Sequence, residues 1–108
     1  MKKTSKKKHY RSAKPFVKNL LKDSEVRVFF EEERAKTLIA EAVRAARLRA
    51  GLTQVQLAKR ANTTQAVISR IESGSDSRIP SLDLLSRIAG ACRAKLAFSF
   101  EFDDTKVA

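Results

Sequence analysis

The strongest constraint on the fold of this chain is a series of helix stop signals in residues 51–74. Gly51 and Gly74 are of the residue type that most often ends a helix in the left-handed conformation, and Asn62 is the commonest non-glycine residue at such a position. Only about two to three helical turns fit between one signal and the next. The spacing therefore predicts two short helices joined by a tight turn, after a preceding helix that ends at Gly51.

Each short helix also has a start signal. Thr53 can accept a hydrogen bond from the first backbone N–H groups of a helix that runs to about Ala61, and Gln56 completes a capping-box pattern. Thr64 is the corresponding cap of a second helix, which we expect to end near Ser73. Start and stop signals thus agree on the same two helices.

The second short helix has two distinct faces. Thr64, Val67, Ile68 and Ile71 have the spacing of a buried stripe. The opposite face fits a DNA major groove, because two helices joined this tightly meet at a steep angle. In the groove Gln pairs with adenine, Arg pairs with guanine, and an Ala methyl contacts the thymine methyl. The predicted base-reading residues are Thr64, Gln65, Ala66, Ser69 and Arg70.

This segment, followed by PSLDLLSRIA at residues 80–89, resembles the helix-turn-helix of the Xre/Cro family, the fold of phage repressors. The resemblance covers roughly residues 36–92, and it implies a mainly α, lambda-repressor-like bundle that binds a double-stranded DNA operator. Asn62 stands where the family usually has Gly, and Asn tolerates the same backbone conformation. The alternative, a helix pair that serves only as a scaffold, has no need of Gln65 and Arg70 on an exposed face. The matching positions are Gly51, Leu52, Thr53, Gln54, Leu57, Ala58, Thr64, Gln65, Ile68, Ser69, Arg70, Ile71, Glu72, Gly74, Pro80, Ser81 and Leu85.

The resemblance implies further roles around these helices. In the family the loop at residues 75–80 lies against the DNA backbone, and Arg47 usually pairs with Glu72. The phosphate contacts implied are Thr53, Gln54, Ser75, Ser77 and Arg78. From the residues themselves, Ser81 is the predicted cap of one more helix. Its inward residues are expected to be Leu82, Leu85, Ile88 and Ala89.

The net charge of +11 over 108 residues favours a polyanionic partner. The charge is uneven, because residues 1–14 contain seven Lys or Arg and no acidic residue. We expect this tail to be disordered when free. Its basic side chains either lie along DNA phosphates or only keep the protein in solution, and both interpretations stay open.

Several classes of protein do not fit the composition. His9 is the only histidine and Cys92 the only cysteine, so we expect no metal site, no catalytic residues, no enzyme activity and no cofactor. Cys92 is predicted to be a small buried hydrophobe at the end of an apolar helix. No apolar run is long enough to cross a membrane, and no signal-peptide core follows the basic N-terminus. We therefore expect a cytoplasmic protein with no membrane partner.

Residues 15–35 are predicted to form a helical extension in front of the DNA-binding domain. Pro15 suits the first position of a short helix, and a longer helix follows from Asp23 or Ser24. The run VRVFF at residues 26–30 would on its own also fit a strand, but its charged, Ala-rich continuation favours helix. The apolar side of the short helix is Phe16, Val17, Leu20 and Leu21. Expected inward residues of the longer helix are Ile39, Val43, Ala46 and Ala50, with Leu38, Ala42 and Ala45 beside them.

The subfamily that the chain most resembles, the HigA-type antitoxins, also has an extension before an "AR…GLTQ" pattern, here Ala46–Arg47 and Gly51–Gln54. Those proteins repress their own operon and neutralise a RelE- or HigB-like mRNA endonuclease. A toxin that holds RNA should be basic, so apolar anchors beside acidic residues would suit it. The toxin-binding residues implied are Phe16, Leu20, Phe29, Phe30, Glu31, Glu32 and Glu33.

Other interpretations of these features stay open. The acidic run also fits the ordinary solvated face of a core helix that binds no toxin. The main alternative function is a stand-alone Xre-family transcriptional regulator without a toxin partner. Two further alternatives are a protein-interaction inhibitor whose DNA binding is vestigial and a basic RNA-binding accessory protein.

Residues 93–103 change from helical to strand periodicity. Leu96, Phe98, Phe100 and Phe102 alternate with smaller or polar residues, which predicts a strand with one apolar face. No second good strand is available in the chain, so the simplest partner is the same strand of a second copy, as in antitoxins of the HipB and HigA kinds. The expected organisation is a basic tail (1–14), a helical extension (15–35), a helix-turn-helix domain (36–92), a dimerising strand (93–103) and a tail (104–108), with five or six helices in all.

Overall fold

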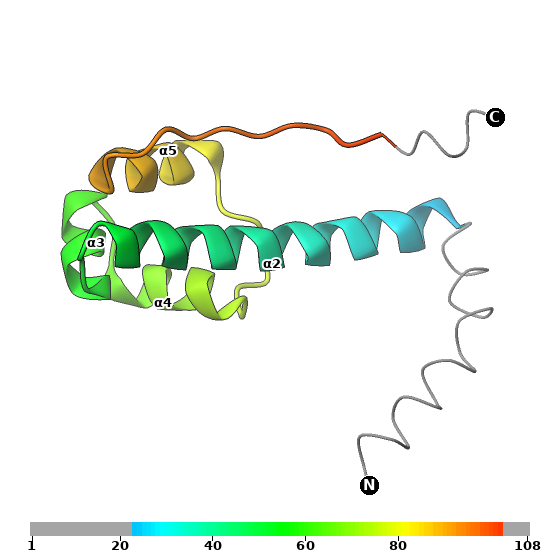
Figure 1. The fold of residues 1–108 in the computed structure, drawn as a ribbon. Coiled ribbons are helices and arrows are strands. Elements are labelled where there is room, and N and C mark those ends of the chain that lie inside the picture. Colours follow the sequence, from blue (N-terminus) through cyan, green and yellow to red (C-terminus); the bar gives the residue numbers. More distant parts are fainter. Residues whose placement is uncertain (1–22, 103–108) are drawn as a thin grey trace, which may run out of the picture. The chain divides into compact units, whose positions relative to one another are not determined.

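A computed structural model of the chain describes residues 23–102, which form helices α2 (Ser24–Arg49), α3 (Gln54–Arg60), α4 (Gln65–Ser73) and α5 (Leu82–Ala91) (Figure 1). The mainly helical fold is confirmed, and this range contains no strand. The chain consists of two compact units, residues 1–38 and residues 39–108, each of which makes most of its contacts within itself. The predicted short helix from Pro15 and the basic tail lie outside the described residues. None of the described helices has the length and apolar character needed to cross a membrane.

The start of α2 is set by Asp23. Its Oδ1 accepts hydrogen bonds from the backbone N–H groups of Glu25 at 2.9 Å and Val26 at 3.3 Å, so Asp23 and not Ser24 caps the helix. Residues 26–30 are helical, as their charged continuation indicated. The helix continues without a break through the predicted boundary between residues 35 and 36.

The short helices begin where their caps predicted. The Thr53 side chain accepts from the Gln56 N–H and the Gln56 side chain accepts from the Thr53 N–H, so both halves of the capping box are present. Thr64 caps α4 by accepting from the Val67 N–H at 3.2 Å. Ser81 caps α5 by accepting from the Leu84 N–H at 3.1 Å.

Each of the described helices is followed by a residue with positive φ. The φ values are 71° at Gly51, 56° at Asn62, 69° at Gly74 and 58° at Arg93. After each of them the next backbone N–H reaches back to a carbonyl in the last helical turn, for example Thr63 to Ala58 at 2.9 Å. The first three ends match the predicted stop signals, whereas arginine at position 93 carries no such signal.

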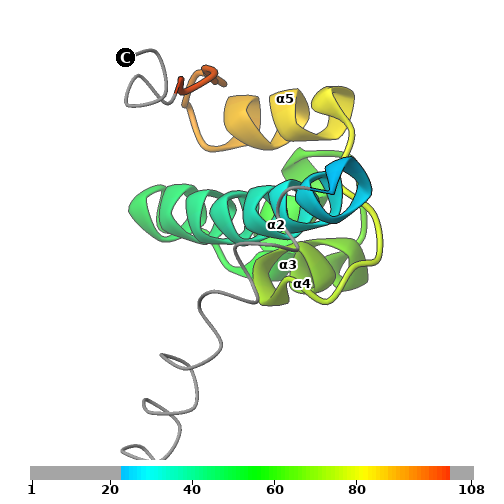
Figure 2. The same ribbon diagram turned by 90° about the vertical axis from the view of Figure 1, so that its right-hand side faces the viewer.

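The core of the second unit lies where α3 packs against α4 and α5. Leu57 and Ile68 are fully buried, and burial of such a side chain contributes about 1.5–3 kcal/mol. Residues 39–49 of α2 lie between α4 on one side and α5 on the other (Figure 1 and Figure 2). The buried cluster is Val43, Leu52, Leu57, Ala58, Ala61, Ile68, Ile71 and Ile88.

Some predicted inward residues are exposed, which corrects the prediction. Leu82 is 60% exposed, and Leu84 packs against the core in its place. The reason is helical geometry, because Leu84 lies one turn before the buried Ile88 whereas Leu82 lies about a third of a turn off that face. On α2 the exposed residues include Leu38, Ala42 and Ala45, and the buried one that was missed is Ala40. Thr64 is exposed as well, because its side chain caps α4 instead of entering the core.

The chain turns at Arg93 and runs back over α5 as an extended trace (Figure 1). Residues 94–102 have no regular secondary structure, and no strand or bridge is formed with them by the rest of residues 23–102. Phe98, Phe100 and Phe102 are 72%, 80% and 83% exposed. The rings of Phe98 and Phe100 touch edge to face with centroids 6.1 Å apart, so side chains two residues apart share one side. The dimerising strand stays a prediction, since a strand needs a partner to form.

Candidate nucleic-acid interface

The outward face of α4 carries four of the five residues predicted to read bases, whereas the fifth, Thr64, precedes the helix and its hydroxyl oxygen caps it. Gln65, Ala66 and Arg70 are exposed and Ser69 is half-buried, while Ile68 and Ile71 on the opposite side are buried. The buried side fixes the helix to the core, so the exposed side has a defined orientation. The face offers an amide, a methyl and a guanidinium, which are the groups that recognise adenine, thymine and guanine in a major groove.

Gln65 is held by a second glutamine at the start of α3. The Gln65 Nε2 donates to Gln54 Oε1 at 2.9 Å, and the Gln54 Nε2 donates to Glu72 Oε1 at 3.2 Å. Each amide is therefore oriented by the next group in the series. Gln65 keeps one N–H and its Oε1 for a ligand, which is what a bidentate contact with adenine needs.

The series ends at an ion pair between Arg47 of α2 and Glu72 of α4, the two residues that the family resemblance pairs. Arg47 Nε lies 2.6 Å from Glu72 Oε2, and Arg47 Nη2 lies 2.9 Å from Glu72 Oε1. Arg47 Nη1 also donates to the Leu52 carbonyl at 2.9 Å. The Glu72 side chain is 4% exposed and that of Arg47 is 12% exposed. This bidentate pair joins the end of α2 to the end of α4.

Protonation of the pair follows from these contacts. Burial acts to raise the pKa of Glu72, but hydrogen bonds from Arg47 and Gln54, with the positive charges of Arg47 and Arg44, outweigh it. The pKa of Glu72 thus lies below its ordinary value of 4.5. The hydrogen bond to Glu72 raises the pKa of Arg47. Both groups are therefore charged at neutral pH.

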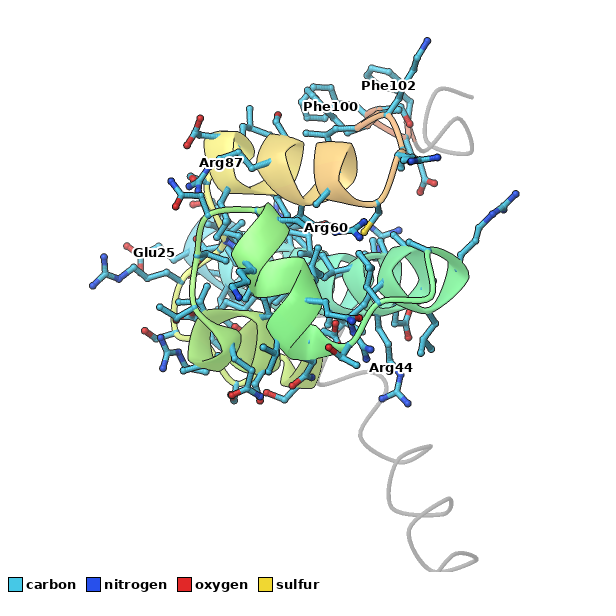
Figure 3. The ribbon with its side chains drawn as sticks, turned by 90° about the vertical axis from the view of Figure 1, so that its left-hand side faces the viewer. Glu25, Arg44, Arg60, Arg87, Phe100 and Phe102 are labelled. Carbon is cyan, nitrogen blue, oxygen red and sulfur yellow. The ribbon has the colours of Figure 1, made fainter. Side chains whose placement is uncertain are left out.

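A contact that sequence reasoning missed joins α5 to the turn between α3 and α4. Arg87 Nη1 donates to the carbonyl oxygens of Ala61 at 2.7 Å and Asn62 at 2.9 Å, and Arg87 Nε donates to Asp83 at 3.2 Å. Figure 3 labels the Arg87 side chain on α5. The spacing of Asp83 and Arg87 indicates a pair along one helix. It carries no information about the turn, which lies 25 residues earlier in the chain.

The predicted phosphate contacts come from two places. Ser75, Ser77 and Arg78 are exposed in the loop after α4, where the Asp76 carboxylate accepts from the Arg78 N–H at 3.2 Å. Thr53 is exposed but its hydroxyl oxygen already caps α3, and Gln54 is engaged by Gln65 and Glu72 as described above. Contacts of these residues with DNA stay predictions.

The residues predicted to bind a toxin divide into two groups. Phe16 and Leu20 lie outside the described residues. Phe29 and Phe30 are 57% and 44% exposed, with ring centroids 5.8 Å apart in an edge-to-face contact. Glu31, Glu32 and Glu33 are also exposed; Glu31 lies 3.7 Å from Arg34, and Glu33 lies 2.8 Å from Lys36.

Comparison with known proteins gives one match. A family model described as helix-turn-helix matches residues 43–98, just over half of the chain. This range contains α3, α4 and α5 together with the end of α2. No curated protein and no solved structure matches the chain.

Proposed function

Because the chain belongs to the helix-turn-helix family of sequence-specific DNA-binding regulators, we propose that it represses an operon by placing α4 in the operator major groove. The observation that carries this proposal is the exposed set Gln65, Ala66 and Arg70 on a helix whose other side is buried. The contact of Gln65 with Gln54 supports it, because an amide oriented before binding loses less conformational entropy on meeting a base.

The charge of the chain supports the same partner. A net charge of +11 attracts DNA at a distance and strengthens binding to any sequence, while the α4 face supplies the discrimination. In this proposal Arg78 and the serines of its loop contact phosphates on either side of the groove.

Footprinting tests the base-reading assignment. Gln65→Ala and Arg70→Ala should each remove about 1–3 kcal/mol of discrimination at one operator position. Arg27 is an exposed arginine on the first turn of α2, so Arg27→Ala is the control for loss of one positive charge. It should weaken the binding of all DNA sequences equally. Unchanged specificity in both α4 variants would show that another helix reads the operator.

We also propose that the regulator is a homodimer joined by residues 93–103. A two-fold dimer can place two copies of α4 about 34 Å apart in successive major grooves. The exposed row Phe98, Phe100 and Phe102 supports this proposal. Burial of each ring by a second copy would contribute about 1.5–3 kcal/mol to the stability of the dimer.

The dimer has its own test. Phe100→Asp should give a monomer that has lost operator affinity, measured by analytical ultracentrifugation and gel shift. Phe29→Asp, also at an exposed ring but on α2, is the matched control and should stay dimeric. A Phe100→Asp chain that remains dimeric and binds a full operator would place the interface on another surface.

We further propose that the chain is the antitoxin of a basic RelE- or HigB-like mRNA endonuclease. The supporting observation is that Phe29 and Phe30 are exposed beside three exposed glutamates on the same helix. Such a surface offers apolar anchors and opposite charge to a basic partner. The alternative is a stand-alone regulator, which uses the same α4 face and has no toxin.

Co-expression separates these two proposals. A small basic protein from the neighbouring reading frame should arrest growth alone and be neutralised by the chain, but not by a variant with Glu31, Glu32 and Glu33 changed to Lys. The charge-reversed variant must still bind the operator as a control for folding. An absent or harmless neighbouring protein favours the stand-alone regulator.

A further inference from the structure

We propose that Arg87 is a positioning residue that holds the turn between α3 and α4 and so sets the orientation of α4 on operator DNA. The inference rests on the proposed base reading by α4. Arg87 belongs to neither the predicted base-reading residues nor the predicted phosphate contacts, and it lies on α5.

The contacts of Arg87 form a fixed bridge. One nitrogen, Nη1, reaches both turn carbonyls, those of Ala61 at 2.7 Å and Asn62 at 2.9 Å. A second nitrogen, Nε, is held 3.2 Å from the Asp83 carboxylate one helical turn earlier. Because the guanidinium is planar, its contact with Asp83 also restricts the direction of Nη1.

The turn is a place where such a bridge matters. Ala61 and Asn62 follow the last residue of α3, where backbone carbonyls lack partners within the helix. Asn62 has a φ of 56°, which costs a non-glycine residue strain. Arg87 gives both carbonyls a charged donor and places a positive charge at the negative end of the α3 dipole.

The orientation of α4 depends on this turn because few residues separate α3, which ends at Arg60, from Gln65. A small change in their backbone angles would tilt α4 and move Gln65 away from Gln54. Bidentate contacts with bases tolerate little misalignment, whereas attraction to phosphates tolerates more. Loss of Arg87 should therefore reduce specificity more than it reduces general affinity for DNA.

The test compares Arg87→Met, which keeps an unbranched side chain without donors, with Arg87→Lys, which keeps the charge. Arg27→Met is the control for loss of one surface charge. The probes are a duplex that the wild-type chain enriches from random-sequence DNA and a scrambled duplex of the same composition. All titrations are made at a temperature where circular dichroism shows each variant to be folded.

We expect Arg87→Met to lower the ratio of affinities for the enriched and scrambled duplexes about tenfold, the effect of losing a charge-assisted hydrogen bond. Arg87→Lys should fall between Arg87→Met and wild type, because an ammonium group can reach the carbonyls without the Asp83 contact. Arg27→Met should leave the ratio unchanged.

A measurement without DNA distinguishes this inference from the proposed function. The N–H groups of Asn62 and Thr63, which donate to Lys59 and Ala58, should exchange with solvent faster in Arg87→Met, while the Leu57 N–H in α3 keeps its rate. Unchanged exchange, or faster exchange with an unchanged affinity ratio, would overturn the positioning role. A wild-type chain that enriches no sequence would overturn both the base-reading proposal and this inference.

Discussion

The ion pair of Arg47 and Glu72 predicts an asymmetric response to mutation. Glu72 is almost fully buried and accepts hydrogen bonds from Arg47 at 2.6 and 2.9 Å and from Gln54 at 3.2 Å. Arg47→Met leaves a buried carboxylate that keeps the hydrogen bond from the neutral amide of Gln54 and the more distant charge of Arg44 but has lost its bidentate partner. Breaking a buried pair in this way costs roughly 3–5 kcal/mol, and we expect about 3–4 kcal/mol of the unfolding free energy to be lost.

Replacing Glu72 should lower the unfolding free energy by less than replacing Arg47 does. In Glu72→Gln the new amide still accepts a hydrogen bond, and Arg47 keeps the Leu52 carbonyl and reaches water at its exposed edge. We expect Glu72→Gln to lower the unfolding free energy by about 1–2 kcal/mol. The double variant Arg47→Met with Glu72→Leu carries neither charge, so it should be more stable than Arg47→Met alone.

The same pair predicts a pH dependence. Because the pKa of Glu72 is lowered in the folded state, its ionised form stabilises the fold above the unfolded pKa, near its ordinary value of 4.5. That stability is lost as the pH falls through the lower folded pKa. Glu72→Gln should therefore flatten the acid limb of the stability curve below about pH 5, where the wild-type chain loses the contribution of this group.

Urea denaturation of the wild-type, single and double variants at pH 7, repeated down the acid limb, measures all of these quantities. Equal losses in the two single variants, with a double variant no more stable than Arg47→Met alone, would refute the reasoning that the pair is buried and coupled. An acid limb of the same slope in Glu72→Gln and wild type would refute the assignment of the pH dependence to Glu72.

Further predictions concern the helix ends and the tail. Arg93→Gly should raise the unfolding free energy by about 0.5–1 kcal/mol, because glycine adopts the φ of 58° without strain. A lower unfolding free energy of this variant in urea denaturation would contradict the prediction. Thr64→Ala should lower the unfolding free energy by about 1 kcal/mol through loss of the α4 cap, and an unchanged urea midpoint would show that the cap is not formed in solution. Deleting residues 1–14 should flatten the salt dependence of DNA affinity if the tail contacts phosphates, and an unchanged slope in gel-shift titrations would show that it does not.

The sequence by itself determined the bounds of the short helices. Thr53, Thr64, Asn62 and Gly74 act through hydrogen bonds and backbone angles that involve residues only a few positions away. Such interactions are the same in any tertiary context, so capping rules could locate α3 and α4. The exposed face of α4 followed from the same helix bounds and the helical period.

Tertiary structure decided which apolar residues are buried and which polar groups meet. Leu82 and Leu84 are both apolar residues of α5, and only the packing of α5 on α3 shows that Leu84 faces the core. The pairing of Arg47 with Glu72 was inferred from family resemblance and not from the residues alone. The bridge from Arg87 to the turn joins positions 25 and 26 residues apart, a distance at which local patterns carry no signal. The Arg87 guanidinium can reach those carbonyls only when packing of the buried cluster has fixed the distance between α3 and α5, because hydrogen bonds form only within about 3 Å.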